Sequence, residues 1–207
     1  MIICANPLAQ FQSYQAEIEA AVSRVLRSNR YILGPEVEAL EHEFADYIGT
    51  RHAIGVANGT DALELAIRAL DIGPGDEVVT VSHTAVATVA AIEAAGAIPV
   101  LVDVDPDFFT LNPEQLQEVL TPKTKAVIAV HLYGQAADLD AIGKFCSDNA
   151  LSLIEDGSQA HGAKWNIVPV DIDGTANPAD IGTKNLPANS TERYATYILD
   201  AGGDNKF

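Results

Sequence analysis

The stretch EVVTVSHTAVATVAAIEAAGAIPVLV, residues 77–102, holds the pattern on which the fold prediction depends. A short run rich in β-branched residues, Glu77–Val81, is followed by a helical stretch, Ala85–Ala95, and then by a second such run, Ile98–Val102. Short apolar runs that alternate with helical stretches are typical of strand–helix–strand units, in which the two strands lie parallel. The stretch therefore predicts an α/β fold.

The same alternation continues on both sides of this stretch. Further β-type runs and helical stretches occupy Ala53–Ala57, Ala62–Leu70, Pro113–Leu120, Ala126–Val130, Leu139–Ser147 and Leu151–Ile154. Such units assemble into a mainly parallel sheet with right-handed crossovers. Ligands of such a sheet bind beyond the carboxyl ends of its strands, so functional residues are expected in the loop after each strand.

The two ends of the chain differ from this middle part. Apolar residues recur at helical spacing in Phe11–Arg27 and in Glu36–Tyr47, which predicts two helices there. From Ile167 onward, prolines, glycines and asparagines interrupt the chain, and no further strand–helix unit is evident. We therefore predict one domain over residues 1–166 and an atypical, irregular tail over residues 167–207.

Composition limits the classes of partner. The 207 residues carry a formal net charge of −17, and 48% of them are hydrophobic, which fits a globular protein and argues against nucleic acid as a partner. Cys4 and Cys146 are the only cysteines, so neither a disulfide framework nor a metal site is predicted. The sequence shows no signal-peptide pattern and no long apolar segment, which predicts a cytoplasmic protein without a membrane partner.

Two loops that follow predicted strands carry polar groups. Asn58-Gly59-Thr60-Asp61 precedes a helix, so the backbone N–H groups of Thr60 and Asp61 and the threonine hydroxyl suit a phosphate. The same residues also suit a plain tight turn with a helix N-cap. Ser82–Thr88 places His83 at the same sheet edge, where its imidazole either covers a ligand ring or is an ordinary hydrogen-bonded histidine.

The densest polar cluster of the chain, Glu155–Ala163, follows the last predicted strand. Asp156 there is able to face a protonated heterocyclic nitrogen and keep it charged, which makes the ring an electron acceptor. Alternatively, Asp156 caps a turn and His161 packs beneath it. A second polar loop, His131–Gln135, is either part of the same site or merely a turn.

Several stretches match a known family in order and spacing. They are Tyr31–Val37, Asn58–Leu63, Gly73–Val78, Val102–Pro106, His131–Gln135, Glu155-Asp156 and Gln159–Ala163. Over about residues 7–165 the chain resembles the DegT-type sugar aminotransferases, which use pyridoxal phosphate. The resemblance implies a fold type I large domain, with a mainly parallel sheet and helices on both faces. It also implies that Gly59, Thr60 and Asp61 receive the cofactor phosphate, that Asp156 pairs with the pyridine nitrogen, and that Gln159 reaches the ring hydroxyl.

The resemblance also assigns residues beside the cofactor ring. Ser82–Thr88 would lie over it, and because many members carry an aromatic residue at the position of Ala85, His83 is the nearby ring left to replace it. The family further needs a lysine that forms a Schiff base with the cofactor, roughly two dozen residues after the His-Gly-Ala stretch. Lys184 lies at about that distance, but the family's Ser-Phe pair before the lysine and glycine after it are absent.

The tail carries a second resemblance. Asn177–Pro187 is similar to the end of the RNase H region in copia-type retrotransposon polyproteins, which implies a fused or rearranged gene product. In that case Lys184 is a surface lysine by chance. Members of the aminotransferase family also continue into a smaller C-terminal domain that closes the site, and that domain is expected to be missing here.

Family resemblance predicts transfer of an amino group from an amino acid, with glutamate as the expected donor, to a nucleotide-linked keto sugar in polysaccharide or amino-sugar biosynthesis. It also implies a homodimer. The alternative is a truncated, inactive relative that at most binds the cofactor or a partner subunit. Dehydration at a sugar carbon, in which a histidine replaces the lysine, ranks last because no histidine follows His161.

Overall fold

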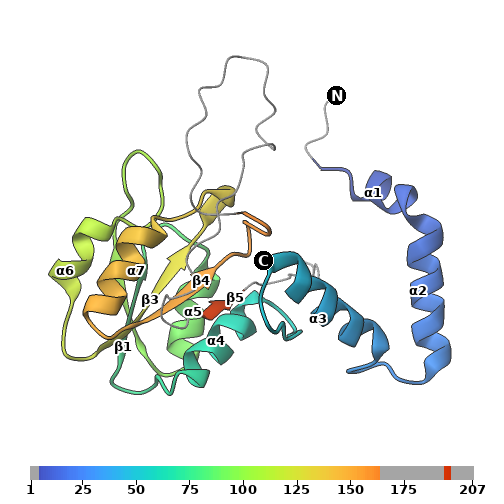
Figure 1. The fold of residues 1–207 in the computed structure, drawn as a ribbon, viewed down its shortest axis with the longest axis horizontal. Coiled ribbons are helices and arrows are strands. Elements are labelled where there is room, and N and C mark those ends of the chain that lie inside the picture. The colour runs from blue at the N-terminus through green and yellow to red at the C-terminus, as the bar shows by residue number, and fades with distance from the viewer. Residues whose placement is uncertain (1–4, 164–193, 197–207) are drawn as a thin grey trace, which may run out of the picture. The chain divides into compact units, whose positions relative to one another are not determined.

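The computed structural model describes residues 5–163 and 194–196, in two compact units formed by residues 1–55 and residues 56–207. Within the described residues, the first unit consists of helices, and the second is built around a parallel sheet (Figure 1).

Three helices make up the described part of the first unit: α1 (Pro7–Ser13), α2 (Gln15–Ser28) and α3 (Pro35–Ile48). The single helix predicted over Phe11–Arg27 is interrupted at Tyr14, whose backbone leaves the helical range with φ −122° and ψ 16°. Asn6 caps α1, because its side-chain oxygen accepts a hydrogen bond from the Ala9 N–H at 3.1 Å. Pro35 starts α3 at a position where its missing N–H costs nothing.

An exposed ion pair joins α2 to α3. Arg24 donates to Glu36 through Nε at 2.8 Å and through Nη2 at 3.2 Å. The hydrogen bond from Arg24, and with it the guanidinium charge, lowers the pKa of the Glu36 carboxyl. Because both side chains are exposed to water, we expect the pair to orient the helices more than to stabilise them.

Within its described residues, the second unit contains five parallel strands in the order β2-β1-β3-β4-β5. They are β1 (Glu77–Val81), β2 (Ile98–Val102), β3 (Thr124–Val130), β4 (Ser152–Asp156) and β5 (Tyr194–Thr196). The register across the centre pairs Val79 with Val127 and Val127 with Leu153. The short β5 lies in the tail predicted to be irregular, and residues 164–193 and 197–207 lie outside the described residues.

The direction of each crossover decides which face of the sheet its helix covers. β1 connects through α5 (Val86–Ala94) to β2, whereas β3 connects in the opposite direction through α7 (Leu139–Asp148) to β4. Right-handed crossovers then place α5 and α7 on opposite faces. Figure 1 shows α4 (Gly59–Ala69) beside α5, and α6 (Leu116–Val119), which continues the 3₁₀ turn Pro113–Gln115, on the side of α7. The predicted parallel α/β sheet with helices on both faces is confirmed.

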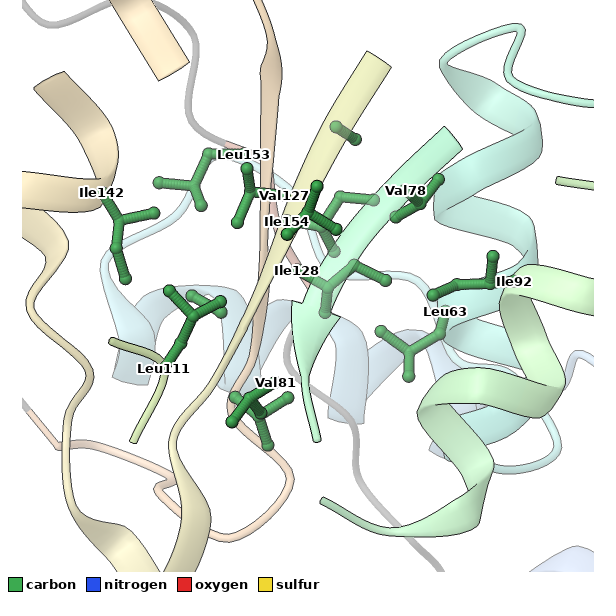
Figure 2. Packing of buried hydrophobic residues seen from close by; sticks show 14 of the residues in the cluster. Leu63, Val78, Val81, Ile92, Leu111, Val127, Ile128, Ile142, Leu153 and Ile154 are labelled. Carbon is green, nitrogen blue, oxygen red and sulfur yellow. The ribbon is translucent and has the colours of Figure 1, made fainter. Parts of the chain in front are cut away.

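The hydrophobic core fills both sides of the sheet. Figure 2 shows Leu63 of α4 and Ile92 of α5 on one side of the strands and Ile142 of α7 on the other. Because both faces of β1 and β3 are covered, these strands are apolar along almost their whole length instead of alternating with polar residues.

One predicted strand is wrong. Ala53–Ala57 forms neither a helix nor a strand, and Ile54 is 82% exposed. The N–H of Gly55 donates to the Glu41 carboxylate at 2.7 Å, so a side chain occupies the donor that a neighbouring strand would use. A β-type sequence becomes a strand only where another strand lies beside it, and the described residues place none next to this segment.

Two further properties follow from the described helices. Not one of them combines the length and the apolar character needed to cross a membrane. Cys146 on α7 is buried, and burial raises the pKa of its thiol to about 12. The thiol is therefore protonated at neutral pH, and we expect it to act as a small apolar core residue.

Candidate functional site

The carboxyl ends of β1 and β3 form the topological switch point of the sheet. These strands are neighbours, but the connections that follow them run in opposite directions and to opposite faces. The helices therefore separate above the sheet edge, and in sheets of this order ligands bind in the crevice that results. The residues just after β1, β3 and β4 are the candidates for this site.

His83 and Tyr133 meet at the switch point, from the loops after β1 and β3. Their ring centroids lie 5.9 Å apart at an angle of 55°, and the Tyr133 hydroxyl lies 3.4 Å from His83 Nε2. His83 was expected here as the ring beside the cofactor, whereas Tyr133 was named only as part of the polar loop His131–Gln135. The missing information was the strand order, because β1 and β3 are neighbours only in the folded sheet.

Tyr133 has a strained backbone that a site residue supports. It has φ 57° and ψ 20° within the short 3₁₀ turn Leu132–Gly134, a left-handed conformation that costs a bulky residue about 1–3 kcal/mol. Its N–H donates to Gln159 Oε1 at 2.6 Å. Gln159 therefore has its carboxamide oxygen committed to Tyr133, and its NH2 group is left to donate to a ligand.

Asp156 ends β4 with one carboxylate oxygen satisfied and the other not. The residue is 5% exposed, and its Oδ1 accepts hydrogen bonds from the Ser158 N–H at 3.1 Å and the Ser158 hydroxyl at 2.7 Å. Oδ2 accepts none from the described residues. A buried carboxylate oxygen without a donor is unfavourable, so a protonated group of a ligand would be stabilised there. Asp156 thus caps a turn as well, and His161 is exposed.

The first turn of α4 is partly occupied by its own cap. Asn58 Oδ1 accepts from the Asp61 N–H at 2.9 Å, and Asn58 Nδ2 donates to Asp61 Oδ2 at 3.0 Å. The expectation that the Asp61 N–H is free is therefore wrong, because the N-cap takes it. In the described part of the chain, the N–H groups of Gly59 and Thr60 and the Thr60 hydroxyl keep no such partner, and they suit an anion.

A buried pair lies behind Asp156, on the other face of β4. His131 Nε2 lies 3.4 Å from Glu155 Oε2, at the long end of the hydrogen-bond range, and both side chains are largely buried. The Ala137 N–H donates to His131 Nδ1 at 3.1 Å, so the ring proton resides on Nε2, facing the carboxylate. The His131 N–H also donates to the Asp156 carbonyl at 3.0 Å. His131 therefore ties the loop after β3 to the end of β4.

Replacing Glu155 by leucine is expected to lower the free energy of unfolding by about 1–3 kcal/mol, because the buried Nε2–H of His131 then has no acceptor. Glu155→Gln is the matched control, since its carboxamide oxygen still accepts. Urea denaturation of both variants measures the difference. Equal stability of the leucine and glutamine variants would show that the pair holds nothing in place.

The described contacts connect only part of the predicted site. Tyr133 links His83 to Gln159, and Asp156 ends the strand that leads into Gln159. No hydrogen bond or ring contact among the described residues joins these side chains to the first turn of α4. Lys184 lies outside the described residues.

A family model connects this geometry with known proteins. The model described as the DegT/DnrJ/EryC1/StrS aminotransferase family matches residues 12–175. The chain belongs to this family. The matched range includes every predicted site residue of this chain except Lys184.

Two relatives of this aminotransferase-family chain are longer proteins. It is 49% identical over 157 residues to a dTDP-3-amino-3,4,6-trideoxy-alpha-D-glucose transaminase of Streptomyces venezuelae, which covers 76% of this chain and 41% of that protein. It is also 49% identical over 149 residues to a UDP-2-acetamido-2-deoxy-3-oxo-D-glucuronate aminotransferase of Pseudomonas aeruginosa, covering 72% of this chain and 42% of the relative. The chain thus spans about two fifths of the length of these relatives.

Solved structures show the same fold. NtdA of Bacillus subtilis, determined with bound cofactor PMP, is 33% identical and superposes with a TM-score of 0.71. The similarity covers 72% of this chain and 34% of the NtdA chain.

Proposed function

We propose that the switch-point crevice of this chain binds pyridoxal 5′-phosphate and serves transfer of an amino group to a nucleotide-linked keto sugar. The observation that carries the proposal is Asp156, whose buried Oδ2 accepts no hydrogen bond from the described residues. A pyridine nitrogen is a base that this carboxylate would keep protonated. The residues present therefore fit the cofactor.

Three groups of side chains would hold the cofactor. Asp156 would keep the proton on the ring nitrogen, while the Gln159 NH2 group would be free to donate to the ring hydroxyl. Gly59 and Thr60 offer N–H groups and a hydroxyl to the phosphate, and Asp61 holds Asn58 in its capping position. His83 would border the ring from the loop after β1. This phosphate site relies on a helix N-terminus, which suits a chain whose net charge is −17.

When bound, the cofactor supplies an electron-accepting ring on which an amino group is carried from donor to acceptor. Asp156 sustains this property, because a positively charged ring nitrogen accepts electrons better than a neutral one. The proposed amino donor is an amino acid, with glutamate as the first candidate. The proposed acceptor is a keto sugar linked to a nucleotide. The two relatives at 49% identity are named for a dTDP sugar and a UDP sugar. Similarity to them therefore does not indicate which nucleotide carries the sugar.

Lys184 is the proposed lysine that joins the cofactor covalently. The test adds pyridoxal phosphate to the purified chain, follows the visible absorption, reduces with borohydride and maps the modified lysine. We expect modification at Lys184, lost in Lys184→Arg and kept in Lys144→Arg, which removes an exposed lysine of α7 paired with Asp148. Binding without a modified lysine would support the inactive cofactor-binding alternative, and absence of binding would overturn the proposal.

A homodimer and a cytoplasmic location are proposed on the family resemblance alone. Gel filtration coupled to light scattering at several protein concentrations tests the dimer. A monomer at all concentrations would contradict it.

A further inference from the structure

Tyr133 combines a disfavoured backbone with a ring left in water. Its φ is 57°, and the residue is 74% exposed. The turn does not need a tyrosine for packing, because so exposed a ring removes little apolar surface from water. Strain that packing does not offset is most often found at sites that contact a ligand.

The side chains that hydrogen-bond to Tyr133 or contact its ring, within the described residues, lie at the switch-point crevice. Gln159 holds its N–H through a 2.6 Å hydrogen bond, and His83 contacts its ring and hydroxyl. His83 follows β1 and Tyr133 follows β3, so the two rings come from the neighbouring strands between which the helices separate. The strained conformation therefore presents an aromatic ring at the mouth of the crevice.

We propose that Tyr133 is a ligand-contacting residue whose ring covers the flat ring of the cofactor, and that Gln159 positions it for this contact. The inference rests on the proposed function. Flat rings attract one another in offset or edge-to-face arrangements, and a phenol held in place loses little conformational freedom on binding. Tyr133 would thereby make the aromatic contact that Ala85 is too small to provide.

Phe109 offers a matched control in the same unit. It is also an exposed aromatic residue in the left-handed region, with φ 58°. Its N–H, however, donates to the Asp105 carbonyl at 2.9 Å, within its own turn. A glycine at either position relieves the backbone strain, but only position 133 has contacts with the crevice residues.

The experiment compares Tyr133→Gly, Tyr133→Ala, Tyr133→Phe and Phe109→Gly in the full chain. The first measurement is Tm without cofactor. Tyr133→Gly is expected to melt about 2–4 °C above Tyr133→Ala, because alanine keeps the strain and glycine does not. Phe109→Gly should be no less stable than the unaltered chain. Equal Tm values for Tyr133→Gly and Tyr133→Ala would show that the conformation is not strained and would overturn the inference.

The second measurement is the dissociation constant for pyridoxal phosphate, from absorption or fluorescence titration. Both small variants at position 133 are expected to bind about tenfold more weakly, which corresponds to about 1.4 kcal/mol. Tyr133→Phe keeps the ring and should bind nearly as well as the unaltered chain, and Phe109→Gly should bind equally well. Tyr133→Gly is therefore expected to have a higher Tm than Tyr133→Ala and a weaker affinity for pyridoxal phosphate than the unaltered chain.

The part played by Gln159 has a readout without cofactor. Gln159→Leu removes the acceptor of the Tyr133 N–H, and a strained Tyr133 that is no longer held is able to relax, which offsets part of the loss. A glycine at position 133 keeps the N–H but has no strain to release, so Gln159→Leu should lower Tm less in the unaltered chain than in the Tyr133→Gly variant. Equal effects in both backgrounds would show that Gln159 does not hold Tyr133, and that part of the inference would be wrong.

The remaining outcomes separate this inference from the proposed function. If the unaltered chain binds pyridoxal phosphate and the small Tyr133 variants bind it equally well, only the inference is overturned. If the unaltered chain binds none, the proposed function is overturned and the inference with it.

Discussion

Replacing Asp156 by alanine is expected to weaken binding of pyridoxal phosphate by about a hundredfold or more. The substitution removes a buried carboxylate from a charged hydrogen bond, a change that costs about 2–5 kcal/mol in well-desolvated sites, and each 1.4 kcal/mol is about tenfold in affinity. Equilibrium titration, followed by the visible absorption of the bound cofactor, measures the change.

Two controls isolate the charge of Asp156. Asp156→Asn keeps an oxygen to accept from Ser158, as Oδ1 does at 2.7 Å and 3.1 Å, so it should fold normally but bind almost as weakly as the alanine variant. Asp148→Asn removes an exposed carboxylate of α7 and should bind like the unaltered chain. Tight binding by Asp156→Asn would contradict the assignment, because the ring nitrogen would then not need a carboxylate.

Truncating Ile128 to alanine is expected to lower the free energy of unfolding by about 2–5 kcal/mol. Ile128 is 0% exposed on β3, which lies in the middle of the sheet between β1 and β4. The lost side chain leaves a cavity that helices packed on both faces are unable to close completely. A loss of this size is a large part of the stability of an ordinary domain.

Val86→Ala is the matched control for the core prediction. Val86 is 84% exposed at the start of α5, so its truncation should change the unfolding free energy by less than about 0.5 kcal/mol. Urea denaturation of both variants gives the comparison, provided that the slope with urea is unchanged. A small effect at Ile128 would show that the sheet centre is not closely packed.

The central strands were predictable because they are buried on both faces. Glu77–Val81 forms β1 at the predicted residues, and the predicted run Ala126–Val130 lies within β3. Ala53–Ala57 has the same character but is not paired with a strand in the described part of the chain. Sequence patterns report what a segment is able to form, whereas pairing depends on a neighbour that lies far away along the chain.

The predicted site was partly correct for a similar reason. Asp156 and Gln159 stood out because a dense polar cluster follows an apolar run, and His83 because it follows another. Tyr133, His131 and Glu155 also lay in polar stretches, but the sequence did not show that they contact one another or the other site residues, since those contacts join residues that are 24 to 50 positions apart. The Asp61 N–H was assigned wrongly because the sequence shows a helix start but not which cap oxygen occupies which donor.

Local patterning was therefore enough to establish the alternation of strands and helices, the loops that bear polar groups and the family resemblance. These properties depend on residues close together in the chain. The strand order β2-β1-β3-β4-β5 came only from the folded sheet. That order places the loops after β1 and β3 side by side, separates their helices to opposite faces and brings Tyr133 to His83 and Gln159. Such contacts arise from packing the whole sheet, so no single segment encodes them.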